Sequence, residues 1–115
     1  MSDDCIFCKI IAGQIPAKIE YQDDDILVFH DITPQAPLHL LIIPKKHITN
    51  LNEIRTENAD IISKIFTQIP KLAFQFEISE KGYRVVNNCG KDGGQTVFHL
   101  HFHMLGGRHL EWPPG

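Results

Sequence analysis

His99, His101 and His103 alternate with apolar residues in the run F-H-L-H-F-H-M-L near the C-terminal end of the sequence. Successive side chains of a strand point to opposite faces, so the three imidazoles are predicted to share one face. A purely structural strand is the weaker interpretation, because threonine, lysine or glutamate would be solvated as well as histidine. Imidazole can bind a metal ion, or it can attack or hydrogen-bond a phosphate group.

The spacing of the three histidines and the loop before them bear on this choice. A strand rises about 3.3 Å per residue, which would place His99 and His103 roughly 13 Å apart. Zinc–nitrogen bonds are about 2 Å long, so one ion cannot bind all three imidazoles. The preceding loop, N-C-G-K-D-G-G-Q-T, has glycines whose amides could approach an anion. Such a loop is more often a simple hairpin, but directly before three histidines it favours phosphate.

The elements that must position these histidines follow from the apolar pattern. Short strands are predicted over residues 17–21, 26–30, 38–43, 83–87 and 97–105. Apolar residues at helical spacing predict one long helix over residues 57–79, bent at Pro70, and a short helix over residues 5–12. Strands that outnumber helices favour an α+β fold with a mostly antiparallel, five-stranded sheet. The tail, residues 106–115, is expected to be extended.

Composition limits the class of protein. A chain of 115 residues is expected to form one domain, residues 1–115. Its 11 Lys and Arg against 14 Asp and Glu give a net charge of −3, which argues against binding to duplex nucleic acid. No apolar run is long enough to cross a membrane, and the acidic start M-S-D-D is unlike a signal peptide. Three cysteines without a secretion signal are typical of the cytoplasm, which is the expected location.

The sequence resembles the histidine triad (HIT) family of nucleotide-binding proteins. The match to the family signature is H-L-H-F-H-M-L, and the likeness continues through I-F-C-K-I-I-A-G, F-H-D-I-T-P-Q-A-P-L-H, I-P-K-K-H-I and G-G-Q-T-V-F-H. The tail G-G-R-H-L-E-W-P-P-G is similar to the Hint branch, the purine nucleoside phosphoramidases. The resemblance implies a HIT-like fold and a homodimer in which two sheets join and the tail with Trp112 reaches toward the partner's site.

The activity that the resemblance implies is hydrolysis of nucleoside 5′-phosphoramidates. The substrates would be AMP or GMP derivatives, and a covalent nucleotidyl-histidine would be the intermediate. Two alternatives stay open: a dinucleoside polyphosphate hydrolase or nucleotidyl transferase, and a regulatory module that binds nucleotides but has lost catalysis. No organic cofactor is expected.

Particular residues match functional positions of the family. His101 corresponds to the nucleophile, His103 to a donor to the phosphoryl oxygens, and His39 to a histidine that supports the nucleophile. Thr96 stands where serine is common and would contact phosphate or assist the leaving group. Asp31 matches a ribose ligand, although it could equally cap the turn that follows it. The other nucleotide contacts implied by the resemblance are Ile6, Phe7, Ile10, Ile32, Asn88, Gly94, Val97 and Trp112.

Cys5 and Cys8 form a C-x-x-C pair, a spacing found in zinc sites. Taken alone, the pair could as well be two cysteines of the core. The resemblance adds His47 and His99, which match the remaining ligands of the structural zinc that several members of the superfamily bind. Many Hint proteins lack the cysteine pair and work without metal, so a zinc site and a metal-free protein are both compatible with the sequence.

Overall fold

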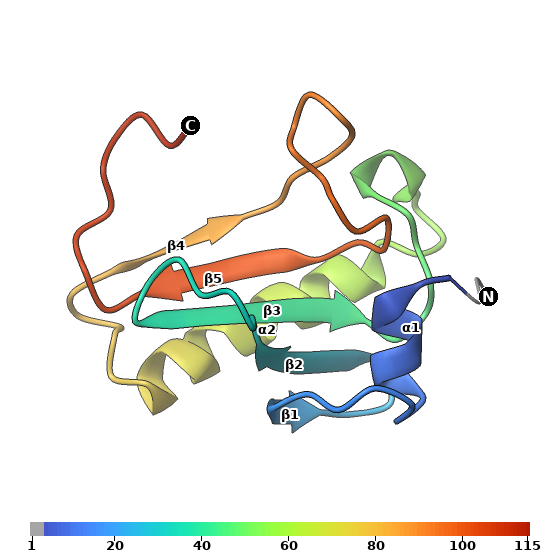
Figure 1. Ribbon diagram of the computed structural model, residues 1–115, viewed down its shortest axis with the longest axis horizontal. Helices are drawn as coiled ribbons and strands as arrows, with labels where there is room; N and C mark the ends of the chain where they lie inside the picture. The colour runs from blue at the N-terminus through green and yellow to red at the C-terminus, as the bar shows by residue number, and fades with distance from the viewer. Residues whose placement is uncertain (1–3) are drawn as a thin grey trace.

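A five-stranded antiparallel sheet, in the order β1-β2-β3-β5-β4, organises the chain (Figure 1). The computed structural model describes residues 4–115, and residues 1–3, which belong to the acidic start, lie outside the described residues. The elements are α1 (Ile6–Ile11), β1 (Ile19–Gln22), β2 (Ile26–His30), β3 (Leu38–Pro44), the 3-10 turn η1 (Leu51–Glu53), α2 (Asp60–Gln75), β4 (Tyr83–Val86) and β5 (Phe102–Gly106). The predicted α+β class, with one short and one long helix, is confirmed.

The sheet is buried on both faces because one helix covers each of them. In Figure 1, α2 lies behind the sheet and α1 lies in front of its right-hand end. Leu40 and Ile42 of β3 join the core under α2, whereas Leu41 and Ile43 join the core under α1. Two apolar layers explain why β3 is buried along its whole length and reads as an almost continuous apolar run. Burying each such side chain contributes about 1.5–3 kcal/mol.

Helix α2 is shorter than the predicted 57–79 and continues through Pro70 without a break. Its end is set by Glu77, which takes a left-handed φ of 59°. The amide of Ile78 then donates to the carbonyl of Ala73 at 2.9 Å, and Ile78 is buried in the core under α2. Ile78 therefore continues the apolar pattern from a turn rather than from the helix. Among residues 4–115, no helix is both long and apolar enough to span a bilayer.

The predicted strand over 97–105 is wrong in its first half, because β5 begins only at Phe102. Pairing with β3 and β4 stops at Phe102 and His103, so the preceding residues bond elsewhere. The amide of Leu100 donates to the carbonyl of Ile48 at 2.6 Å. The predicted sidedness is nevertheless correct: the apolar residues between the histidines are buried in the core under α2, namely Leu100, Phe102 and Met104.

Candidate active site

A cavity of about 400 Å³ opens on the face of the sheet that α1 covers. Apolar side chains from α1 and β2 line one part of it, and His101 and His103 line another. Asp31 and Ile32, which follow β2, lie at its edge with Thr96 and Val97. The predicted site residues that the structure brings together here are Ile6, Phe7, Ile10, Asp31, Ile32, Thr96, Val97, His101 and His103.

Three predicted nucleotide contacts do not line this cavity. Asn88 borders a second, smaller cavity on the other side of His103. The amide of Gly94 donates to the carbonyl of Lys91 at 3.0 Å within the loop, so this amide is already bonded. Trp112 is 80% exposed and contacts Arg84, whose guanidinium lies 6.0 Å from the centre of the indole ring.

Sequence reasoning missed several apolar residues that line the cavity, including Ile15, Pro16, Ala17, Phe29 and Leu41. The sequence holds no signal for them, because apolar residues beside or within strands are expected in the core. Ile32, which the family resemblance implied, also lines the cavity and is 95% exposed.

The main chain sets the tautomer of His101. Its Nδ1 lies 2.7 Å from the carbonyl oxygen of His99, which can only accept, so Nδ1 carries the proton. Nε2 is then the nitrogen with a free lone pair. Burial lowers the pKa of His101 below its ordinary value of 6.5 and keeps the ring neutral near pH 7. The ring of Phe7 packs edge-on against it, with centroids 5.1 Å apart. A neutral imidazole with an unprotonated nitrogen is a nucleophile that needs no separate base.

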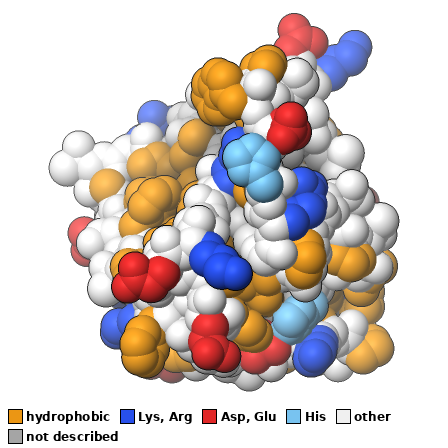
Figure 2. Space-filling view, turned by 90° about the vertical axis from the view of Figure 1, so that its left-hand side faces the viewer, with side chains coloured by type: hydrophobic (Ala, Val, Ile, Leu, Met, Phe, Trp, Pro, Cys, Tyr) orange, Lys and Arg blue, Asp and Glu red, His pale blue; other side chains and the backbone are white. Residues whose placement is uncertain are grey.

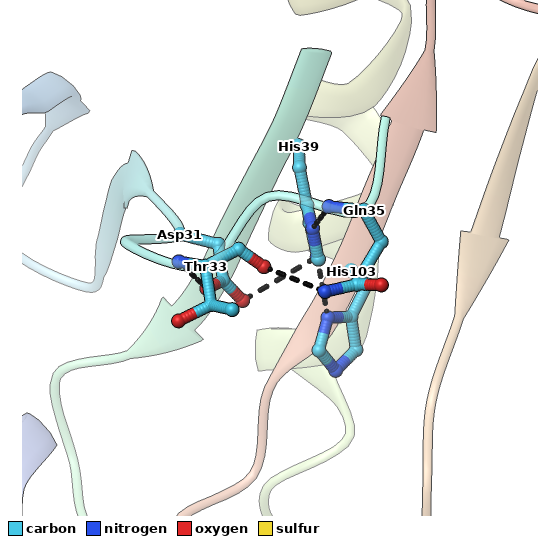
Figure 3. A network of polar contacts seen from close by, with 5 residues as sticks. All are labelled: Asp31, Thr33, Gln35, His39 and His103. Atoms are coloured by element: carbon cyan, nitrogen blue, oxygen red, sulfur yellow. Dashed lines mark hydrogen bonds and ion pairs between the residues drawn. The ribbon is translucent and has the colours of Figure 1, made fainter. Parts of the chain in front are cut away.

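His39 and His103 form a relay of hydrogen bonds that Figure 3 shows. The amide of Gln35 donates to Nδ1 of His39 at 3.0 Å, so the proton of His39 is on Nε2. That Nε2 lies 2.8 Å from Nδ1 of His103 and donates to it, which leaves the proton of His103 on Nε2. Burial lowers the pKa of His39 and that of His103, the latter to about 4. His103 therefore presents an N–H donor while remaining neutral.

Asp31 joins this network at the end of β2 (Figure 3). Its Oδ2 lies 3.5 Å from Nε2 of His39, and its Oδ1 accepts from the amide of Thr33 at 2.8 Å. The turn-capping role that the sequence left open is therefore present. It does not exclude a second role, because the Asp31 carboxylate also borders the cavity.

Cys5, Cys8, His47 and His99 form a second cluster, in which one ligand atom from each lies within 4.8 Å of the others. The Nδ1 atom of His99 lies 3.3 Å from Sγ of Cys5 and 3.6 Å from Sγ of Cys8. The Nδ1 atom of His47 lies 3.3 Å from Sγ of Cys8. A tetrahedral zinc site requires sulfur–nitrogen separations of about 3.5 Å. Nε2 of His99 lies 2.8 Å from the carbonyl of Pro44 and donates to it, so Nδ1 faces the cysteines without a proton.

Two of the seven histidines lie apart from both clusters. His30 points to the face covered by α2, where it pairs with Glu20 and packs against the ring of Phe76. His109 is exposed in the tail, with its Nε2 3.4 Å from a carboxylate oxygen of Glu111. Each of these two histidines thus has a partner close by in the structure and belongs to neither cluster.

The five-stranded antiparallel sheet with two helices and the histidine-lined cavity define a class of small α+β proteins. The HIT domain family matches residues 12–110, and the chain belongs to this family. A HIT family hydrolase from Legionella pneumophila has a crystal structure that superposes with a TM-score of 0.95 at 50% identity, covering 97% of this chain and 100% of that one. The resemblance found in the sequence is therefore confirmed.

Two curated relatives span almost all of the chain. A purine nucleoside phosphoramidase of Escherichia coli is 46% identical over 110 residues, which cover 96% of this chain and 92% of that protein. An uncharacterised HIT-like protein of Synechococcus elongatus is 51% identical over 115 residues, the full length of both chains. The relatives place the chain among HIT proteins that include hydrolases.

Proposed function

We propose that the protein hydrolyses nucleoside 5′-phosphoramidates, with AMP or GMP derivatives as substrates. The observation that carries the proposal is the tautomer of His101, whose Nδ1–H is held by the carbonyl of His99 and whose Nε2 is bare. The phosphoramidase activity of the Escherichia coli relative supports the same substrate class. The apolar part of the cavity would hold the base, and the Asp31 carboxylate can accept from two ribose hydroxyls.

The first step forms a bond between Nε2 of His101 and the α-phosphorus. The phosphorus–nitrogen bond of the substrate breaks, and the leaving nitrogen takes a proton from solvent water as it departs as an amine. The Nε2–H of His103 donates to a phosphoryl oxygen, where negative charge develops in the transition state. The Thr96 hydroxyl lies at the edge of the cavity and can contact the phosphate or the leaving group.

The second step hydrolyses the intermediate. Water adds to phosphorus and gives up a proton to solvent, the bond to Nε2 of His101 breaks, and the nucleoside monophosphate leaves with the oxygen of that water. His101 returns to its neutral tautomer because the carbonyl of His99 holds the Nδ1 proton throughout. His39 keeps the proton of His103 on Nε2 through both steps.

The test combines turnover with capture of the intermediate. Adenosine 5′-phosphoramidates should be hydrolysed, and rapid quenching in denaturant at alkaline pH, where a phosphorus–nitrogen bond is stable, should leave one adenylyl group on the peptide that contains His101. His101→Ala should abolish both signals, whereas His109→Ala, an exposed control, should leave them unchanged. Near-normal turnover by His101→Ala would rule out this mechanism.

Cleavage of a dinucleoside polyphosphate is the second candidate, because a smaller cavity bordered by Arg84 and Arg108 opens beside His103. Comparing kcat/KM for an AMP amidate with that for diadenosine polyphosphates separates the two activities. Tight AMP binding without turnover of either substrate would instead identify a regulatory module.

We also propose that Cys5, Cys8, His47 and His99 hold a structural zinc ion. The support is the separation of their sulfur and nitrogen atoms and the tautomer of His99. Bound zinc would tie the start of α1 to the segment before His101 and leave no open position for substrate. Thiolate ligands suit a reducing compartment, in keeping with a cytoplasmic location. Protein purified without chelators should contain about one zinc per chain, and less than about half an equivalent would contradict the site.

We also propose that two copies of the chain form a homodimer in which their sheets join. In the single chain, β4 is an edge strand of the sheet. An edge strand exposes unpaired backbone groups, which a partner's strand can satisfy.

A further inference from the structure

A second cavity of about 260 Å³, the C-terminal cavity, lies between the end of the sheet and the tail. His103 lines both this cavity and the larger one, so its imidazole is their common wall. Leu105 and Leu110 contribute apolar surface, and Arg84 and Arg108 border the cavity. A group attached to the phosphorus can therefore extend past His103 into a compartment separate from the one that would hold the nucleoside.

Positive charge distinguishes the C-terminal cavity. Within residues 4–115, neither Arg84 nor Arg108 lies within ion-pair distance of a carboxylate. Figure 2 shows the molecule from the side on which the tail leaves the sheet, and lysine and arginine side chains lie beside histidines on this face. Among residues 4–115, Lys64 alone of the lysines and arginines pairs with a carboxylate, so Arg84 and Arg108 stand out because both border this cavity.

Main-chain carbonyls hold both guanidinium groups in place. Nη2 of Arg84 donates to the carbonyl of Glu111 at 2.9 Å, and Nη2 of Arg108 donates to the carbonyl of Gln35 at 2.8 Å. A carbonyl orients a guanidinium without neutralising it, and a guanidinium has five N–H donors. Donors therefore remain on both arginines to bind a planar or tetrahedral anion.

We infer that the C-terminal cavity binds an anionic substituent of the leaving group, either a carboxylate or a phosphate. The inference rests on the proposed function and specifies which amidates the site prefers. In the transfer step the bond to Nε2 of His101 forms, the phosphorus–nitrogen bond breaks and the amine nitrogen takes a proton from solvent water. The anionic substituent is unchanged and stays paired with the arginines.

Arg108 is the better residue to test, because Arg84 also holds the tail. Arg84 bonds the carbonyls of Leu110 and Glu111 and contacts the ring of Trp112, so its loss would release the tail. Arg108 could instead act on His103 indirectly, since Gln35 donates to Nδ1 of His39. The two roles predict different results: a charge role affects anionic substrates alone, and a positioning role affects all of them.

Three adenosine 5′-phosphoramidates with short amines provide the comparison. In the amidates of β-alanine and 2-aminoethyl phosphate, the amine carries a carboxylate or a phosphate group. In the amidate of β-alaninamide, the amine carries an uncharged group of similar size. The kcat/KM for one or both anionic substrates should exceed that for the neutral one by about tenfold, and the better of the two identifies the anion. Arg108→Gln should remove most of the difference, and Arg108→Lys should retain part of it. Arg55→Gln, an exposed arginine outside the cavity, is the matched control.

The inference would be overturned by equal kcat/KM values for the three amidates. It would also be overturned if Arg108→Gln lowered kcat/KM equally for charged and neutral substrates, because that pattern indicates positioning through His39. Failure to hydrolyse any amidate would contradict the proposed function rather than this inference. In that case the affinities of the corresponding methylene analogues, which cannot be cleaved at the bridging position, decide whether the cavity binds anions.

Discussion

Different hydrogen-bond partners place three histidines of one short run in different chemical states. The carbonyl of Pro44 turns Nδ1 of His99 toward the cysteines, and the carbonyl of His99 leaves Nε2 of His101 bare. His103 takes its state from His39, which donates to its Nδ1. The residue type supplies the imidazole, and the hydrogen-bond partner decides whether that imidazole can bind a metal, attack phosphorus or donate to an oxygen.

Burial of His103 makes the stability of the protein depend on pH. Its pKa is lowered from 6.5 to about 4 in the folded chain, so below pH 6.5 the unfolded chain binds more protons than the folded one. The contribution of His103 to stability is therefore lost as the pH falls from about 6.5 to about 4. The free energy of unfolding, measured by denaturant titration, should decrease over this window.

The His103→Asn variant isolates this effect, because asparagine does not titrate. At equal zinc loading its free energy of unfolding should depend less steeply on pH between about 6.5 and about 4 than that of the wild type. His109→Asn should keep the wild-type slope, since the side chain of His109 is 86% exposed. An unchanged slope in His103→Asn would show that its imidazole titrates normally.

No pattern in the sequence singles out Asn87. Its Nδ2 donates to the carbonyl of His101 at 2.8 Å, just beyond the last pair of the β4–β5 ladder, Val86 with His103. A side-chain amide thus continues the pairing where the backbone of β5 has turned away. It holds the main chain of the proposed nucleophile at the point where it leaves the sheet.

Asn87→Asp should lower the free energy of unfolding by about 1–3 kcal/mol, because a carboxylate cannot donate to the carbonyl of His101. It should also lower kcat more than it raises KM, since the nucleophile is displaced while the cavity for the nucleoside is kept. Denaturant titration and steady-state kinetics measure the two effects. Asn52→Asp, at an exposed position in η1, is the control. Wild-type values for the Asn87 variant would show that this hydrogen bond is unimportant.

Elements were predictable from the sequence wherever one local pattern dominates. Alternation and apolar runs located the strands, and helical spacing located α2. The ends were less predictable because they depend on bonds to distant residues. The backbone at Leu100 bonds Ile48 instead of continuing β5, and Ile78 extends the apolar pattern of α2 from beyond its end. The cysteine–histidine cluster needed the family resemblance, since His47 is 39 residues from Cys8 in the chain.

The end of α2 offers a test at this scale. Glu77 has a left-handed φ of 59°, a conformation that glycine adopts without steric cost, and its exposed side chain makes no hydrogen bond among residues 4–115. Glu77→Gly should therefore raise the free energy of unfolding by about 0.5–1 kcal/mol. Glu80→Gly, in the following turn at a negative φ, should leave stability unchanged or lower it. A less stable Glu77→Gly protein would contradict this account of the helix end.

The C-terminal tail lies beside β4, the edge strand through which the sheets of two copies would join. Arg84 of β4 donates to the carbonyls of Leu110 and Glu111 and lies over the ring of Trp112. The tail is thus fixed to the same strand that has an unpaired edge. Phe66 and Phe74 of α2 are also exposed, at 48% and 80%. Apolar side chains and an open edge strand on one chain fit an interface with a second copy.

Truncation after Gly107 tests whether the tail contributes to both assembly and selectivity. Removing residues 108–115 takes away the groups that cover Arg84, so the dimer should dissociate at higher protein concentration than the wild type. The ratio of kcat/KM values for a bulky and a small neutral amidate should also change, because the tail would reach toward the partner's site. Trp112→Ala separates the ring from the rest of the tail and should change the ratio with little effect on assembly. Light scattering measures assembly, and steady-state kinetics measure selectivity. Wild-type values for both in the truncated chain would show that the tail contributes to neither the dimer interface nor the choice of substrate.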